Sequence, residues 1–155
     1  MRALRAPMLQ VKLPQLHTVD LSRNDRLTDI TAEHLSKCAQ LQHVKLEATN
    51  LTDAAVEHLA KCPLLRIASF EECVALTREA AVHLNDFPQL QEVNLTNIWP
   101  SDVVDGIADA LATCTQLKTI RPKTLADTVA KKVANLQAAV SKLLRRQHGA
   151  GRSHL

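Results

Sequence analysis

Three histidines recur at a regular spacing that could serve metal chemistry. His34, His58 and His83 lie 24 and 25 residues apart, and imidazole nitrogens are ligands for zinc and copper. A tetrahedral site needs a further carboxylate or thiol, and none recurs at the same phase. We therefore predict no metal site and no bound cofactor, and place these histidines on the surface of a repeated helix.

Four cysteines are the other residues with reactive side chains, namely Cys38, Cys62, Cys73 and Cys114. Cys38 and Cys62 fall in successive repeats, where their Cα atoms could come within the ~4.4 to 6.8 Å that a disulfide allows. Their regular, inward placement favours buried free thiols in a reducing compartment instead. We therefore expect an intracellular protein.

The N-terminal region bears on the compartment. Arg2, Arg5 and Lys12 precede the first acidic residue, Asp20, which is compatible with a mitochondrial transit segment, although serine enrichment is lacking. No run of eighteen apolar residues and no secretory signal is present. The cytoplasm is the favoured location, mitochondria are the alternative, and no integral membrane segment is expected.

No catalytic motif is found. The chain has no G-x-S-x-G, no P-loop and no H-E-x-x-H, and its carboxylates are scattered. Only 3 glycines and 2% aromatic residues argue against glycine-rich phosphate loops and aromatic nucleic-acid platforms. We predict that the protein is not an enzyme.

A repeat of 24 to 27 residues must position these groups. It begins at Leu16, Leu41, Leu65, Leu90 and Leu117, with an aliphatic residue three positions later and, except in the last unit, an apolar residue five positions later. Each such strand is followed by a helix, for which Thr28, Thr52, Thr77 and Ser101 are the predicted N-caps. One unit cannot bury enough apolar surface to fold alone, so the units must stack.

Two segments carry a resemblance to a known family: LTDITAEHLSKCAQLQHVKLEATNLTD and LTDAAVEHLAKCPLLRIASFEECVALTREA. They resemble the cysteine-containing leucine-rich repeats of F-box substrate receptors and relatives of ribonuclease inhibitor, over about residues 13–121. The resemblance implies an α/β leucine-rich repeat solenoid, a short right-handed superhelix with parallel strands on the concave face and helices on the convex face. It also implies that Cys38, Cys62 and Cys114 follow helices and that Cys73 lies in a strand-to-helix turn. No F-box precedes the repeats.

The chain divides into four predicted segments: an N-terminal partial cap (1–13), the repeat domain (14–122), a basic amphipathic helix (123–148) and a flexible tail (149–155). Strand residues that point outward on the concave face are predicted to bind a partner. They are Asp20, His43, Lys45, Glu47, Ser69, Glu71, Glu92, Asn94 and Arg121. Trp99, on an irregular loop, is either an exposed anchor for a partner or a local plug.

The C-terminal region is strongly basic. Residues 118–155 carry nine basic side chains and one acidic, whereas residues 1–117 carry ten basic and fifteen acidic. A capping box at Thr124 and Asp127 and an apolar stripe predict a helix over residues 124–147, ended by Gly149 and Gly151. Its basic residues lie off the stripe: Lys131, Lys132, Lys142, Arg145 and Arg146. It either caps the last strand, docks on a partner through the stripe, or lies on a membrane or nucleic acid.

These features predict a non-catalytic protein-protein interaction module, an adaptor or small structural subunit of a larger intracellular assembly. One alternative is a peripheral ribonucleoprotein subunit that contacts RNA through the basic helix. Another is the substrate-receptor part of a ubiquitin ligase whose F-box lies outside this chain.

Overall fold

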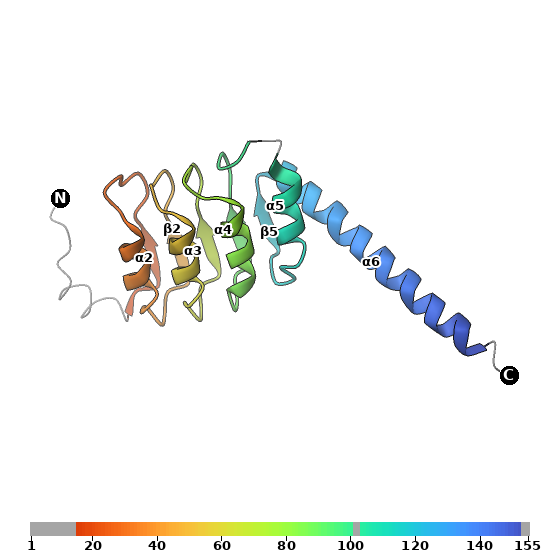
Figure 1. The fold of residues 1–155 in the computed structure, drawn as a ribbon. Helices are drawn as coiled ribbons and strands as arrows, with labels where there is room; N and C mark the ends of the chain where they lie inside the picture. Colours follow the sequence, from red (N-terminus) through yellow and green to blue (C-terminus); the bar gives the residue numbers. More distant parts are fainter. Residues whose placement is uncertain (1–14, 101–102, 153–155) are drawn as a thin grey trace.

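Strands and helices alternate along the chain (Figure 1). The structure is a computed structural model that describes residues 15–100 and 103–152. Its strands are β1 (Thr18–Asp20), β2 (His43–Lys45), β3 (Ile67–Ser69), β4 (Glu92–Asn94) and β5 (Thr119–Arg121). Its helices are α2 (Asp29–Leu35), α3 (Asp53–Leu59), α4 (Arg78–His83), α5 (Val104–Leu111) and α6 (Lys123–Arg152), and the short 3-10 helix η2 (Leu84–Asp86) extends α4. The predicted α/β class is confirmed. The predicted N-terminal segment 1–13 and the predicted cap Ser101 lie outside the described residues.

The five strands form one parallel sheet in the order β1-β2-β3-β4-β5. Its register places equivalent residues of the five units side by side, in a row that runs Val19, Val44, Ala68, Val93 and Ile120. Backbone hydrogen bonds continue past the strand ends, as from Arg23 to Glu47 and from Ala48 to Glu71. The predicted alignment of the repeats is therefore confirmed residue by residue.

The core lies between the sheet and the helices. Leu41, Leu65 and Leu90 are completely buried, whereas Leu16 and Leu117 are only partly buried. The three inner leucines have a described unit on both sides, which is why they lose all contact with solvent. Full burial of such a side chain contributes about 2 kcal/mol, so the contacts between neighbouring units stabilise the fold.

Helices α2 to α5 stand side by side on one face of the sheet (Figure 1). Helices α2, α3 and α5 present the buried leucines Leu35, Leu59 and Leu111 to the core, and η2, directly after α4, presents Leu84. The Thr52 and Thr77 hydroxyls accept hydrogen bonds from backbone N–H groups of their helices, as predicted for N-caps. Thr28 occupies the N-cap position of α2, but its side chain makes no capping hydrogen bond.

A carboxylate joins each of the helices α2 and α3 to the next unit. The N–H and hydroxyl of Thr52 donate to the two Asp29 oxygens at 2.9 and 2.5 Å. The N–H of Thr77 donates to Asp53 at 2.8 Å, and the Thr77 hydroxyl donates to the other Asp53 oxygen. We call each four-atom contact an Asp–Thr clasp. Because each Asp lies in the first turn of its helix, it also interacts favourably with the helix dipole.

A left-handed residue follows each of the first four strands. Its φ is 61° at Arg23, 52° at Ala48, 60° at Glu72 and 58° at Asn97. The chain reverses there and turns the next side chain inward, which buries Thr49, Cys73 and Ile98. Glycine is the residue that usually marks such a conformation, and none of these four positions is glycine, so no glycine pattern predicts these turns.

Helix α6 starts by covering the end of the sheet and then leaves the body (Figure 1). Leu125 and Val129 are buried, and Val133 packs partly against the core. The predicted capping box at Thr124 and Asp127 is wrong, because α6 already begins at Lys123 and places both residues inside the helix. The predicted end of the helix at residue 147 is also wrong: α6 continues to Arg152, since neither Gly149 nor Gly151 interrupts its backbone.

Candidate functional site

The face of the sheet opposite helices α2 to α5 carries the predicted partner-binding residues. Seven of the nine line one depression of about 220 Å³, together with Ile67, Ala68, Val93 and Thr119. The seven are His43, Lys45, Glu47, Ser69, Glu92, Asn94 and Arg121. Asp20 on β1 and Glu71 after β3 do not line it. The sheet register therefore gathers residues that are up to 78 positions apart in the chain.

Hydrogen bonds between units hold several of these side chains in place. The Ser69 hydroxyl donates to Glu47 at 2.6 Å, and the Asn94 amide donates to Glu71 at 3.0 Å. Ser69 lines the predicted face, but only 6% of its surface stays exposed because this network encloses it. Side chains fixed in this way lose little further entropy on binding.

The middle row of this face carries charges of both signs, because Asp20 pairs with Lys45 on the neighbouring strand and Arg121 occupies the same row on β5. Hydrogen bonds from the side chain and backbone N–H of Ser22 lower the pKa of Asp20, and the charges of Lys45 and His43 add to this effect. Asp20 is therefore an anion at neutral pH. The described face offers donors, acceptors and both signs of charge, with the half-buried Ile67 as an apolar contact.

Trp99 is a structural plug and not an exposed anchor. Its indole N–H donates to the Leu76 carbonyl at 3.0 Å, and its ring packs partly buried against the core. Of the two predicted roles, the structure supports the plug. The loop is longer in this unit, and the indole satisfies a carbonyl of the preceding unit.

The four cysteines are free and buried. Burial raises the pKa of Cys62 to about 12 and that of Cys114 to about 11, and it also raises the pKa of Cys38. Cys73 donates to the Leu46 carbonyl at 2.9 Å. Because the thiolate is the reactive form, the three thiols with raised pKa values are poor nucleophiles at neutral pH. The expectation of buried free thiols is confirmed.

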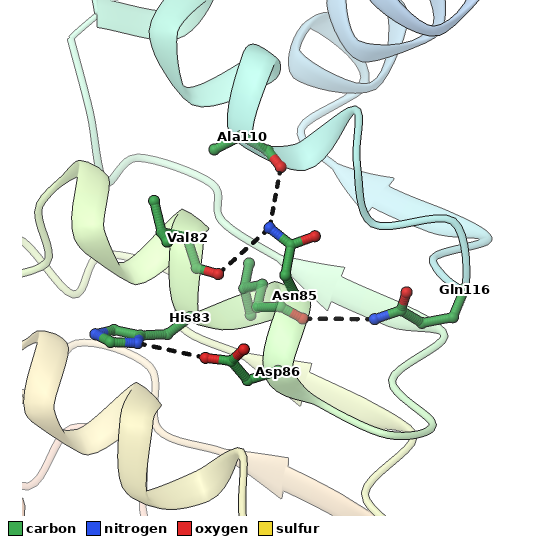
Figure 2. Close-up of polar contacts among 7 residues, drawn as sticks. Val82, His83, Asn85, Asp86, Ala110 and Gln116 are labelled. Carbon is green, nitrogen blue, oxygen red and sulfur yellow. Dashed lines mark hydrogen bonds and ion pairs between the residues drawn. The ribbon is translucent and has the colours of Figure 1, made fainter.

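The three repeated histidines do not gather into a metal site. No group of three or more potential metal ligands occurs in the described ranges, residues 15–100 and 103–152. His83 Nδ1 lies 3.8 Å from an Asp86 carboxylate oxygen (Figure 2). His58 Nδ1 is buried and has no hydrogen-bond partner within the described ranges.

Asn85 is a polar residue that the sequence analysis missed. Its amide nitrogen donates to the Val82 and Ala110 carbonyls, both at 3.3 Å (Figure 2). Its carbonyl oxygen accepts from the Thr113 hydroxyl at 2.9 Å and from the Cys114 thiol at 2.9 Å. Asn85 thus joins α4 to α5, the helix that follows the longer loop. An isolated asparagine after a helix gave no periodic signal.

Most of the predicted basic helix residues are exposed on α6. Lys131, Lys142, Arg145 and Arg146 are exposed. Lys132 differs, because its ammonium forms an ion pair with Asp109 of α5 at 3.1 Å. Part of the basic face therefore holds α6 on the body, and the remaining charges are free to act on a partner.

Within the described part of the chain, no helix is both long enough and apolar enough to cross a membrane.

Comparisons with known proteins do not assign this chain to a family. No protein-family model matches the chain, and no curated protein matches it.

Proposed function

We propose that this chain is a short leucine-rich repeat solenoid that acts as a non-catalytic protein-protein interaction module. It serves as an adaptor or small structural subunit of a larger intracellular assembly. Its strands line the concave, partner-binding face, and its helices form the convex face. The partner is a protein segment whose polar and charged groups complement both signs of charge on the sheet.

The arrangement of the open sheet face carries this proposal. Side chains of four successive strands line one depression, and inter-unit hydrogen bonds hold Ser69, Glu47, Asn94 and Glu71 in position. Preorganised polar groups favour specific binding because little ordering entropy remains to be lost. Repeat proteins of this kind commonly use such extended concave surfaces for binding.

A charge swap on this face tests the proposal. Lys45→Glu combined with Glu92→Lys leaves the net charge unchanged, and both residues are exposed. The matched control, Lys37→Glu with Glu57→Lys, exchanges the same two residue types at exposed positions on the helical side.

Affinity purification from cell extract with quantitative mass spectrometry is the measurement. Proteins bound by the wild type and the control should be lost from the face variant, because charge complementarity is reversed there. Circular dichroism checks that all three chains fold. Identical partner sets for the face variant and the wild type would contradict the proposal.

A second candidate function is RNA binding through α6, favoured by the exposed Lys131, Lys142, Arg145 and Arg146. Phosphate contacts release counterions, so the affinity for a single-stranded RNA should fall steeply with added salt. Replacing Lys142, Arg145 and Arg146 with alanine should reduce the slope of log K against log salt by about 2, at about 0.7 per phosphate contact for single strands. An unchanged slope in fluorescence anisotropy titrations would exclude these contacts.

A further inference from the structure

One apolar stripe runs the length of α6 but changes its environment midway. Its first members, Leu125, Val129 and Val133, pack against the body. The stripe continues in phase with side chains that the described residues leave uncovered: Leu136 is 52% exposed, Val140 55%, Leu143 59% and Leu144 52%. Four large aliphatic side chains in one exposed stripe are unusual unless something covers them.

The stripe has the spacing of a two-helix seam. From Val129, its members recur at steps of 4, 3, 4 and 3 through Val133, Leu136, Val140 and Leu143, which matches the 3.5-residue period of a coiled coil. Helical segments gain most of their stability from packing of an amphipathic face. We therefore infer that the projecting half of α6 pairs with the same segment of a second copy, in antiparallel orientation.

The orientation follows from what covers the beginning of the stripe. In a parallel pair, the second helix would run along the stripe towards residue 125 and would meet the α5 and β5 elements that bury Leu125 and Val129. In an antiparallel pair, the two bodies lie at opposite ends of the overlap and do not compete for this space. Only the antiparallel arrangement uses the exposed half of the stripe alone.

A second copy can pair along this stripe without bringing basic groups together. With Val140 of one copy opposite Leu143 of the other, the positions that flank the seam bring Arg146 next to Ala139 and Gln137 next to Leu144. No basic residue in the overlap faces another basic residue across the seam, although this half of α6 is strongly basic. The other basic side chains, Lys131, Lys142 and Arg145, lie on the far side of the helix from the seam, where they do not oppose pairing.

The size of the contact predicts a weak dimer. An overlap of about four helical turns from each copy buries on the order of 1,000 Å² in total, at the small end of specific interfaces. We expect a dissociation constant of about 10 µM. The dimer would carry one sheet face at each end. A partner with two copies of its binding segment would bind the dimer more tightly than the monomer, because binding of the first segment raises the effective concentration of the second. The inference does not depend on what the sheet face binds.

Sedimentation velocity of the full chain over a concentration series tests the pairing. The wild type should shift from monomer to dimer around the expected constant, and Leu136→Glu combined with Leu143→Glu should remain monomeric to about 100 µM. Ala134→Glu with Ala138→Glu is the matched control, because it adds the same charge on the opposite side of α6 and should still dimerise. Circular dichroism confirms that each variant keeps its helix content.

Cross-linking tests the orientation. Antiparallel pairing places Leu136 opposite Gln147 of the second copy, so Leu136→Cys and Gln147→Cys chains should be joined by a short bismaleimide when mixed, and poorly when either is treated alone. The native thiols are buried and should not compete. Cross-linking within each variant alone, without a mixed product, would overturn the orientation.

A wild type that stays monomeric at about 100 µM would overturn the whole inference. If that monomer bound anionic phospholipid vesicles and Leu136→Glu with Leu143→Glu abolished the binding, the stripe would belong to a lipid surface. A wild-type dimer whose constant is unchanged by the same two substitutions would overturn it as well.

Discussion

Replacing Asp53 with alanine should destabilise the fold by about 2 kcal/mol, because it breaks an Asp–Thr clasp. The Asp53 carboxylate accepts from both the N–H and the hydroxyl of Thr77. Hydrogen bonds to charged groups contribute about 1.5 to 3 kcal/mol each when shielded, and exposure at Thr77 reduces this sum. Loss of a negative charge from the first turn of α3 adds about 0.5 kcal/mol.

A double-mutant cycle isolates the contact from these other effects. Thr77→Val removes the hydroxyl, which also caps α4 by accepting from the Glu79 N–H, and should cost about 2 kcal/mol. The pair Asp53→Ala with Thr77→Val should cost about 3 kcal/mol, which leaves a coupling of about 1 kcal/mol for the bond between the two side chains.

Urea unfolding followed by circular dichroism and by the fluorescence of Trp99, the only tryptophan, measures these differences. In thermal melts, the midpoint temperature of Asp53→Ala should be lower by about 6 °C, at roughly 3 °C per kcal/mol for a domain of this size. Glu57→Ala on the same helix is the control and should change stability by less than about 0.5 kcal/mol. Additivity of the two clasp substitutions within about 0.3 kcal/mol would refute the reasoning.

Four further predictions concern buried groups and one helix. At pH 8, iodoacetamide should label the cysteines only after urea is added, because burial holds the Cys62 pKa at about 12 and the Cys114 pKa at about 11. Mass spectrometry counts the adducts, and rapid labelling of the folded protein would contradict this prediction. Because these thiols ionise near pH 9 when unfolded, stability should fall as the pH rises above 9, which thermal melts at increasing pH would show or disprove. Gly106→Ala should raise stability by about 0.5 to 1 kcal/mol, because Gly106 lies inside α5 and an added Cβ has no neighbour nearer than 4.0 Å; a lower unfolding midpoint would count against it. Trp99→Phe should cost about 1 kcal/mol by leaving the Leu76 carbonyl without its donor, and an unchanged urea midpoint would argue against the plug.

The repeat made the fold of this chain predictable to a large extent. Leu41, Leu65 and Leu90 were aligned from their spacing alone, and the sheet register pairs their units in the same phase. Stacked units must bury equivalent positions together, because each unit lacks a core of its own. The outward rows followed from the alternation of side chains along a strand, which is why most of the candidate face was identified in advance.

Other features escaped prediction because periodicity carries no information about them. The environment of Trp99 depends on a carbonyl of another unit, and a loop sequence does not show which way an indole turns. The alternation of side chains places Ser69 on the open face, but its enclosure depends on Glu47 of the neighbouring unit. The first turn of α6 was misplaced, since Thr124 and Asp127 have the spacing of a capping box without serving as one.

The amino-acid sequence alone thus determined the strand and helix order, the phase of the units and the burial of their leucines, because a chain with this apolar period can hide its side chains only by stacking. Tertiary structure decided how the units are joined through the Asp29 and Asp53 clasps, and where α6 leaves the body. Both depend on distances between side chains of different units, and those distances are set only when the units pack.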